Sequence, residues 1–399
     1  MRILLINEEC GTGSTGRICT DIAEALEKKG HEVKIAYGRN DNIVPEQFKR
    51  FAIKIGNNME LKLHGVKARL LDGAGFGSTV STRKFIKWVK EYDPDIIHLH
   101  NLHGYYINVA ILFEYLKKCE KKIFWTLHDV WAFTGHSAYC DAVQCEKWKS
   151  GCGRCPQLLV YPKAYIDRSM QNWCKKRALF TGVKGMEIIT PSKWLKNLVS
   201  QSFLKAYPVK VIHNGIDTEK FCVLKNNCKE KHNLIDKKII LSVATVWNDL
   251  KGYTDFIKLA ECLDEEYLIV LVGGREQVKK VIVPTNMRVI DRTQNIQELV
   301  ELYNAADVYL NLTYCDTYPT VNLEAVACGT PVISYKVGGS TESTLDFGGI
   351  IVKRGDLKGV VEALKVSGEL KVKIADVNKL DKSYAISEYM KLYQKVELA

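Results

Sequence analysis

Residues 316–334, DTYPTVNLEAVACGTPVIS, hold the pattern around which the rest of the chain is organised. Two acidic residues, Asp316 and Glu324, stand eight positions apart in it. Pro319 favours the start of a helix, because proline is well accommodated at the first helical position, and Gly329 favours its end. The stretch therefore predicts a helix N-terminus between two carboxylates. Backbone N–H groups at such an end bind phosphate and carboxylates accept hydrogen bonds from hydroxyl groups, so a sugar nucleotide, which carries both, is indicated.

The length and composition indicate a globular protein of two domains. The 399 residues are enough for two full cores, and 46% of them are hydrophobic. No uninterrupted apolar run approaches the roughly 20 residues that span a bilayer, and the N-terminus MRILLINEECGTG turns polar too soon for a secretory signal. The 13 cysteines, an odd number, argue against a disulfide framework. We expect a cytoplasmic location, with association with the inner membrane left open.

The net charge of +11 has two interpretations. It fits an anionic partner, such as a nucleotide diphosphate, lipid headgroups or nucleic acid, or a basic surface that is simply solvated. No long basic run stands out, and pairs such as Lys28-Lys29 and Lys175-Lys176 fit solvated helix faces. We prefer the solvated surface and expect no nucleic-acid partner.

A strand, a glycine-rich loop, a helix and a second strand are predicted at the start of the chain. The strands are residues 2–7 and 33–37, and the loop is residues 10–16. This order is that of a βαβ unit, which belongs to a parallel sheet. The loop lacks the full dinucleotide spacing, so it predicts a backbone loop facing the ligand, or a plain tight turn. The helix is expected to bury the apolar side chains of Ile18, Ile22, Ala25 and Leu26.

The same alternation resumes at Lys238 and continues through most of the second half of the chain. We therefore predict two doubly wound, Rossmann-like α/β domains that face each other across a cleft. The first domain is expected at residues 1–205, the second at 206–382, and a final helix at 383–399 is expected to cross back to the first.

Polar side chains follow two of the strands predicted in the first half. His100 ends one strand and His103 comes shortly after it, while His128 and Asp129 follow the next strand. Because ligands of open parallel sheets lie beyond the carboxyl ends of the strands, these residues are candidates for a binding site. The alternative for each histidine is a hydrogen-bonded core position.

A cysteine-rich insert, HSAYCDAVQCEKWKSGCGRCP, occupies residues 136–156. Four clustered cysteines whose last pair is Cys-x-x-Cys predict a structural zinc held by thiolates, with His136 as a spare ligand. Free or buried thiols are the alternative. The candidate metal ligands are Cys140, Cys145, Cys152 and Cys155.

With these motifs the chain resembles the retaining glycosyltransferases of the GT-B fold, specifically glycosyltransferase family 4, over nearly its full length. The resemblance is carried by Asp316 to Glu324, by Lys251-Gly252 and by His213 to Asp217 (HNGID). The insert, from Thr134 to Pro156, resembles one bacterial branch that builds capsule, O-antigen or exopolysaccharide.

The resemblance implies roles for individual residues. Asp316, where the family has glutamate, would contact the hydroxyls of the donor sugar, Glu324 would bind the ribose, and Lys251 would neutralise the diphosphate. The family's arginine before this lysine is replaced here, and Arg275 is our candidate substitute. The remaining donor-binding candidates are Gly13, Tyr318, Pro319, Thr320 and Val321. His128 would lie near the reacting sugar, and the acceptor-side candidates are Ser14, His100, His103 and Asp129.

The chemistry implied by the resemblance retains the anomeric configuration by front-face displacement, in which the leaving diphosphate helps to deprotonate the acceptor. His128, Asp316, Glu324 and Lys251 are the expected catalytic set. No divalent metal or other cofactor is expected for this step, because cationic side chains and the helix N-terminus would stabilise the leaving charge.

The function expected is therefore that of a hexosyltransferase in the synthesis of a cell-surface polysaccharide. The expected partners are a nucleotide sugar donor, with uridine preferred, a glycan or lipid-linked acceptor, and a membrane surface as a peripheral contact. Two alternatives remain open: a nucleotide-sugar epimerase of the same fold, and a non-catalytic subunit that binds sugar nucleotides.

Overall fold

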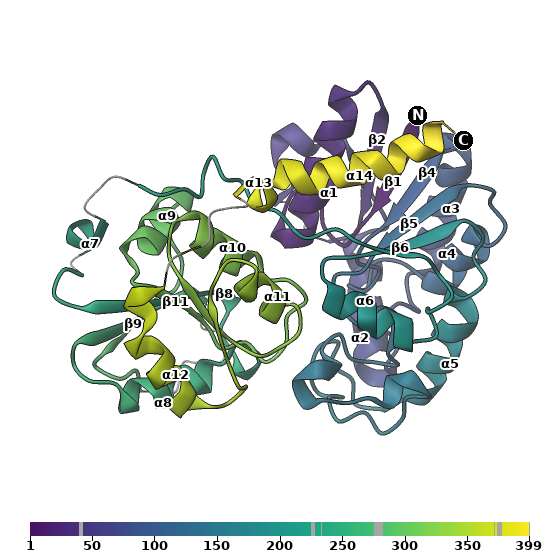
Figure 1. The fold of residues 1–399 in the computed structure, drawn as a ribbon. Coiled ribbons are helices and arrows are strands. Elements are labelled where there is room, and N and C mark those ends of the chain that lie inside the picture. The colour runs from purple at the N-terminus through teal and green to yellow at the C-terminus, as the bar shows by residue number, and fades with distance from the viewer. Residues whose placement is uncertain are drawn as a thin grey trace. The chain divides into compact units, whose positions relative to one another are not determined.

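The computed structural model describes residues 1–39, 43–224, 228–232, 234–274, 282–370, 372 and 377–398 (Figure 1). The chain folds into two compact units. The first comprises Met1–Ile212 with Ile386–Ala399, and the second His213–Ala385. The corresponding boundaries predicted from the sequence lie after residues 205 and 382.

The first unit is built on a seven-stranded sheet with the order β3-β2-β1-β4-β5-β6-β7. All of its strands are parallel, and at the centre Ile6 of β1 pairs with both Ala36 of β2 and Leu99 of β4. The central strands are buried along their length, as expected for strands covered by helices on both faces. The strands are β1 Arg2–Ile6, β2 Glu32–Tyr37, β3 Ala52–Lys54, β4 Ile96–Leu99, β5 Lys122–Thr126, β6 Met186–Thr190 and β7 Val209–Val211.

Helices cover this sheet, and α14, the last helix of the chain, ends beside it (Figure 1). The hydroxyl of Tyr393 on α14 lies 2.5 Å from Nδ1 of His98 on β4. In α1 the buried apolar face is Cys19, Ile22, Ala23 and Leu26, so the predicted face was displaced by about one position: Ile18 and Ala25 are only partly buried. The helices are α1 Gly13–Lys28, α2 Asn58–Leu71, α3 Thr79–Tyr92, α4 Val109–Leu116, α5 Ser169–Phe180, α6 Lys193–Gln201 and α14 Lys382–Glu397, with short 3-10 turns η2 Glu46–Phe48, η3 Trp131–Phe133, η4 Cys140–Val143 and η5 Lys147–Lys149.

The second unit has a six-stranded parallel sheet with the order β10-β9-β8-β11-β12-β13. Its strands are β8 Lys238–Val246, β9 Tyr267–Gly274, β10 Met287–Ile290, β11 Val308–Asn311, β12 Val332–Tyr335 and β13 Ile350–Val352. Its helices are α7 Cys228–Lys231, α8 Tyr253–Cys262, α9 Ile296–Ala305, α10 Thr320–Ala327, α11 Ser340–Leu345, α12 Leu357–Lys365 and α13 Val377–Leu380, with 3-10 turns η6 Asp249–Lys251 and η7 Ser367–Glu369.

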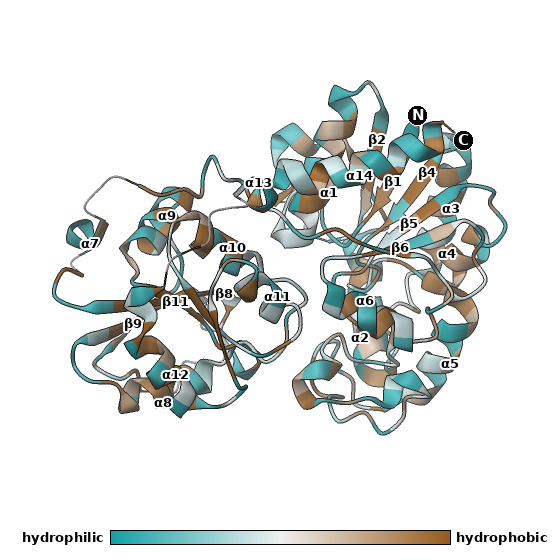
Figure 2. Cartoon of the chain, in the orientation of Figure 1, coloured by the Kyte–Doolittle hydropathy of each residue, from teal (hydrophilic) through white to brown (hydrophobic). Residues whose placement is uncertain are grey.

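Successive residues of the second sheet pack into different cores. Tyr309 and Val332 belong to one apolar cluster, whereas their neighbours Leu310 and Ile333 belong to another. Because alternate side chains of a strand point to opposite faces, the sheet is covered on both sides. The hydropathy colouring shows the same contrast, with apolar strands inside and polar residues on the outward faces of helices (Figure 2). Both units are thus doubly wound, Rossmann-like domains, which confirms the predicted fold class.

Among the helices that the structure describes, none combines the length and the apolar character that crossing a membrane requires.

Candidate functional site

The stretch quoted first, residues 316–334, forms the loop that leads into α10, helix α10 itself and most of strand β12. The helix begins at Thr320, and Pro319 is its N-cap in an extended conformation, with φ −68° and ψ 121°. The prediction of proline at the first helical position was therefore one residue early. Gly329 follows the helix with φ 82°, a left-handed conformation that glycine adopts without strain, and the next strand begins at Val332. The predicted helix start between two carboxylates is present.

Glu324 is held in place by a tyrosine from the preceding helix. The hydroxyl of Tyr303 on α9 donates a hydrogen bond of 2.9 Å to Oε2 of Glu324. Tyr303 is fully buried, and its pKa is raised well above the usual value by burial and by the charge of Glu324, so it remains a donor. The carboxylate is partly exposed, which leaves it able to accept a further hydrogen bond from a ligand.

Asp316 and Lys251 form an ion pair. The Lys251 ammonium donates to Oδ2 of Asp316 over 3.1 Å, and the side chains are 39% and 20% exposed. Burial lowers the pKa of Lys251, but the charge and hydrogen bond of Asp316 outweigh it and the net shift is upward. The structure thus joins two residues 65 positions apart that the sequence analysis assigned to one ligand.

Local backbone geometry places Lys251 beside this stretch. Lys251 ends turn η6, whose N-cap Asn248 accepts a hydrogen bond from the Lys251 N–H. The carbonyl of Leu250 accepts hydrogen bonds from Tyr314 N–H at 2.8 Å and from the Thr313 hydroxyl at 3.1 Å, which join the turn to the residues after β11. Gly252 has φ 76°, and a Cβ there would lie 2.3 Å from the carbonyl oxygen of Leu312, so this approach needs glycine.

A second polar centre lies on the buried side of α10. Asn322 is fully buried. Its Oδ1 accepts from Asn311 of β11 at 2.8 Å, and its Nδ2 lies 3.0 Å from the Ser343 hydroxyl of α11. No sequence pattern singled this residue out. Asn322 therefore joins α10, the helix that carries Glu324, to β11 on one side and to α11 on the other.

The HNGID segment also contacts this stretch. The ring of His213 stacks on that of Tyr318 with centroids 4.6 Å apart, and Asn214 Nδ2 donates to the Tyr318 carbonyl at 3.1 Å. Tyr318 is buried, as is Pro319. Thr320 and Val321, the other two donor-binding candidates here, form the partly exposed first turn of α10. Arg275, the candidate substitute for the family's arginine, lies outside the described residues.

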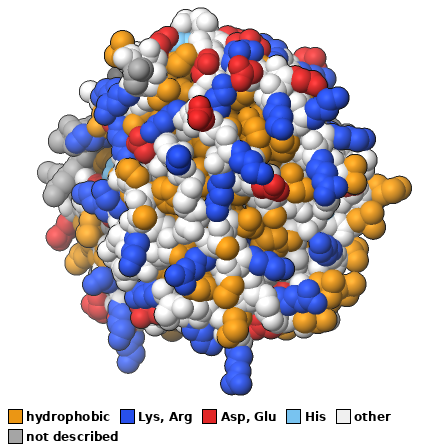
Figure 3. Space-filling view, turned by 90° about the vertical axis from the view of Figure 1, so that its right-hand side faces the viewer, with side chains coloured by type: hydrophobic (Ala, Val, Ile, Leu, Met, Phe, Trp, Pro, Cys, Tyr) orange, Lys and Arg blue, Asp and Glu red, His pale blue; other side chains and the backbone are white. Residues whose placement is uncertain are grey.

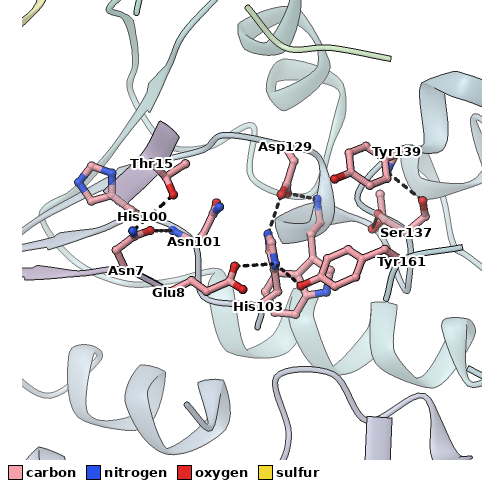
Figure 4. A network of polar contacts seen from close by, with 12 residues as sticks. Asn7, Glu8, Thr15, His100, Asn101, His103, Asp129, Ser137, Tyr139 and Tyr161 are labelled. Carbon is pink, nitrogen blue, oxygen red and sulfur yellow. Dashed lines mark hydrogen bonds and ion pairs between the residues drawn. The ribbon is translucent and has the colours of Figure 1, made fainter. Parts of the chain in front are cut away.

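In the first unit, the glycine-rich loop is tied to the residues after β4 (Figure 4). Asn7, fully buried at the end of β1, donates to the carbonyl of Glu9 at 2.7 Å and accepts from the backbone N–H of Asn101 at 3.3 Å. Helix α1 begins inside the predicted loop, at Gly13. Gly13 and Ser14, both site candidates, are exposed in its first turn.

His103 is the centre of a charged network (Figure 4). Its Nε2 lies 2.6 Å from Oδ2 of Asp129, and its Nδ1 lies 3.1 Å from the Tyr161 hydroxyl and 3.9 Å from Oε2 of Glu8. Glu8 is also paired with Arg39. Burial lowers the pKa of His103, but Asp129 and Glu8 outweigh it and raise the pKa overall. Burial raises the pKa of Asp129, but His103 outweighs it and lowers the pKa.

The other histidines of this edge form a row of neutral rings. His98 and His100 have centroids 4.2 Å apart, and Nδ1 of His100 lies 3.0 Å from Nε2 of His128. Burial lowers the pKa of His98 to about 3 and that of His128 to about 4. Burial also puts the pKa of His100 well below the usual value, and its Nε2 is buried without a hydrogen-bond partner. Near neutral pH, His128 is therefore uncharged, and it can form hydrogen bonds with a ligand only as a neutral imidazole.

Sequence reasoning found four of the polar residues at this edge and missed three. Glu8, Arg39 and Tyr161 belong to the same network as His103 and Asp129. Glu8 could have been found, because it directly follows a predicted strand in the same way as His128. Tyr161 follows the cysteine-rich insert and Arg39 follows the second strand, and neither position carries a signal of its own.

The cysteine-rich insert forms its own small cavity. Cys140, Cys145, Cys152 and Cys155 all line it, together with His136. None of the 13 cysteines, all of which lie within the described residues, forms a disulfide bond. Within the part of the chain that the structure describes, no group of three or more histidine, cysteine, aspartate or glutamate side chains is arranged to hold a metal ion.

The chain matches two family models. Residues 15–220 match the family model described as Glycosyltransferase Family 4, and residues 225–369 match the one described as Glycosyl transferases group 1.

Two curated relatives and one solved structure illustrate the similarity. The putative colanic acid biosynthesis glycosyl transferase WcaC of Escherichia coli is 25% identical over 92% of this chain and 90% of its own. The N,N'-diacetylbacillosaminyl-diphospho-undecaprenol alpha-1,3-N-acetylgalactosaminyltransferase of Campylobacter jejuni is 28% identical over 48% of this chain and 56% of its own. The structure of Anabaena HepE in complex with UDP has a TM-score of 0.67 at 13% identity, covering 99% of this chain and 100% of that one.

The family-4 model covers more than half of the chain, and the group 1 model matches most of the second domain. With two Rossmann-like domains, each with polar residues at the carboxyl ends of its strands, this chain belongs to glycosyltransferase family 4.

Proposed function

We propose that this glycosyltransferase moves a hexose, with retention of configuration, from a UDP-sugar to a glycan or lipid-linked acceptor during synthesis of a bacterial cell-surface polysaccharide. The observation that carries the proposal is the start of α10, where Glu324 and the Lys251–Asp316 pair accompany a helix N-terminus. A relative named for colanic acid biosynthesis and a similar fold seen with UDP support it.

In this proposal the second unit binds the donor. The backbone N–H groups of the first turn of α10, at Thr320 and Val321, meet the diphosphate, and the Lys251 ammonium neutralises its charge. Glu324 accepts hydrogen bonds from the ribose hydroxyls, and Asp316 from the sugar. Lys251 would exchange part of its contact with Asp316 for the phosphate, because an ammonium has three donors.

The first unit supplies the remaining groups. His128, uncharged near neutral pH, contacts the reacting sugar by hydrogen bonding. The residues that face or shape the acceptor position are Ser14, His100, His103 and Asp129. The network around His103 holds Asp129 and Glu8 in fixed positions, so that the acceptor meets oriented carboxylates without reorganisation.

The transfer step in this proposal uses no metal ion. The bond from the anomeric carbon to the diphosphate breaks as the acceptor hydroxyl attacks from the same face, and the departing phosphate oxygen takes up the hydroxyl proton. The chain's contribution is to stabilise the charge that develops on the diphosphate, through Lys251 and the α10 N-terminus.

A membrane-bound acceptor is supported by the surface of α2. Met59, Leu63, Val66 and Leu70 recur at helical spacing and are between 50% and 72% exposed. Basic residues Lys62, Lys67 and Arg69 lie on the same helix. Lysine and arginine side chains also lie between apolar ones over the face shown in Figure 3. An apolar stripe with flanking positive charge suits an anionic lipid surface, where a lipid-linked acceptor would be found.

A donor screen tests the function. The purified enzyme would be incubated with UDP- and GDP-sugars and an extract of lipid-linked glycans, and released nucleotide would be measured. We expect UDP release from one donor, dependent on the acceptor. Glu324→Ala should abolish it, whereas Glu362→Ala, at an exposed position of α12, should not. Nucleotide binding without release from any donor would contradict the proposal, and normal turnover by Glu324→Ala would contradict the site.

Sedimentation with vesicles tests the membrane contact separately. Wild-type protein should bind vesicles rich in anionic phospholipid, and a Leu63→Gln/Val66→Gln variant should bind them less while still releasing UDP with a water-soluble acceptor. Equal binding of the two proteins would remove α2 from the proposal.

A further inference from the structure

The cavity in the cysteine-rich insert has an unusual lining. Four cysteines and His136 border a space of about 20 Å³, enough for about one water-sized particle. They come from separate parts of the segment 136–155, and the other residues around them include the apolar ring of Trp148. Soft sulfur and imidazole ligands gathered in this way are the ligand types that zinc selects.

His136 has one nitrogen bound and the other without a partner. Nδ1 lies 2.6 Å from Oδ1 of Asp72, and since a carboxylate only accepts hydrogen bonds, Nδ1 carries the proton. Nε2 is then the nitrogen left to bind a metal, and it is buried with no hydrogen-bond partner. The His136 side chain is fully buried. A buried polar atom without a hydrogen-bond partner lowers the stability of the fold by about 1–3 kcal/mol. A bound ligand at Nε2 would remove this cost.

Asp72 is built into the fold in a way that fixes the His136 ring. It ends α2 with φ 50°, a left-handed conformation that is uncommon outside glycine. Its Oδ2 accepts the backbone N–H of Arg168 at 3.2 Å, and its carbonyl accepts from Asn172 Nδ2 at 2.6 Å. Asp72 thus joins α2 and the start of α5 to the insert. A carboxylate that binds the second nitrogen of a histidine is the usual outer partner of a metal-bound imidazole.

Cys152, the first residue of the Cys-x-x-Cys pair, has a backbone donor that suits a thiolate. The Gly135 N–H donates to Sγ of Cys152 at 3.2 Å. Hydrogen bonds of this kind stabilise negative charge on sulfur, which a metal-bound thiolate carries.

We propose that this cavity is a structural zinc site, in which Nε2 of His136, Cys152 and Cys155 bind the ion together with Cys140 or Cys145, and Asp72 orients the imidazole. The ion would fasten the insert to the end of α2 and the start of α5. In the described residues no three such side chains are already arranged to hold a metal ion, so the proposal requires the ligands to adjust on binding, with release of the thiol protons to solvent. The site is separate from the residues proposed for transfer, and its test does not depend on activity.

Metal content of the purified full chain is the first test. We expect about one zinc per chain by mass spectrometry, and after removal and replacement by Co²⁺ an intense near-ultraviolet absorption from cobalt–thiolate bonds. Cys152→Ser should lose the metal, whereas Cys174→Ser, at an exposed position of α5, should keep it. Serine variants of Cys140 and Cys145 decide which of the two is the fourth ligand.

His136 and Asp72 test the part of the proposal that goes beyond the cysteines. Asp72→Asn should weaken zinc binding about 10- to 100-fold in competition with a chromophoric chelator. His136→Asn should weaken it further, and His136→Cys should restore binding with an altered cobalt spectrum. Zinc-free wild-type protein that gives no cobalt–thiolate absorption would overturn the proposal, even if the variants do not fold. Unchanged affinity in His136→Asn would overturn the role of His136.

Discussion

Replacing Tyr303 by phenylalanine isolates the contact that orients Glu324. The substitution removes one hydroxyl, which donates over 2.9 Å to the carboxylate and is fully buried. A hydrogen bond to a charged group contributes about 1.5–3 kcal/mol to stability, so the free energy of unfolding should fall by that amount. If Glu324 binds the donor, ordering its freed side chain costs a further ~0.5–1.5 kcal/mol on binding, which weakens UDP affinity roughly 2- to 12-fold.

Tyr309 provides a matched control for this prediction. It is also fully buried, and its ring lies 5.6 Å from that of Tyr303. Its hydroxyl contacts uncharged groups: it accepts from the Val243 N–H and donates to the Val243 carbonyl, each over 3.4 Å, and it also contacts the Ser242 side chain. Because hydrogen bonds between neutral groups contribute less than those to a charged group, Tyr309→Phe should lose less stability than Tyr303→Phe and bind UDP as the wild type does. Urea denaturation gives the stabilities, and titration calorimetry with UDP gives the affinities.

The two measurements separate the structural claim from the functional one. Tyr303→Phe that is as stable as Tyr309→Phe would refute the energetic reasoning. If Tyr303→Phe loses stability but binds UDP with unchanged affinity, the energetic role of the hydrogen bond is supported, but the assignment of Glu324 to the nucleotide is refuted.

Three further outcomes are expected. Lys251→Met should weaken UDP binding about 10- to 100-fold, because a charge-assisted contact with the diphosphate is lost; equal affinities in calorimetry would place the diphosphate elsewhere than beside Asp316. Gly252→Ala should lower the free energy of unfolding by at least about 2 kcal/mol in urea, since φ is 76° and the new Cβ would lie 2.3 Å from a carbonyl oxygen; wild-type stability would show that the loop can move. The pKa of His103 is raised in the fold, so its contribution to stability is present below its ordinary pKa and is lost as pH rises through the raised value. His103→Gln should therefore cost more stability at pH 6 than at pH 9, with Asp129 ionised at both, and an equal cost at the two pH values would argue against a charged imidazole.

Much of the fold could be predicted because its signals are local. Buried parallel strands are continuous apolar runs, such as residues 3–6 and 239–241, and glycine or proline marks the ends of the elements between them. The start of α10 was predicted to within one residue from Pro319 and Gly329. In a parallel sheet, ligands bind at the edge where the strands end, and the direction of the chain shows which edge that is. For this reason His100, His128 and Asp129, which end or follow predicted strands, could be identified as candidates.

The tertiary structure decided which of those residues touch and which carry charge. The hydrogen-bond partners of the site residues are distant in sequence: Glu324 is 21 positions from Tyr303, Asn322 is 11 from Asn311 and His103 is 26 from Asp129. Nothing in the sequence distinguishes Tyr303 from the other tyrosines. Charge depended on surroundings: His103 and His128 are both histidines at one sheet edge, yet the carboxylates beside the first raise its pKa and burial lowers that of the second. Pairing and protonation depend on distance and solvent exposure in three dimensions, and those are quantities that residue order does not contain.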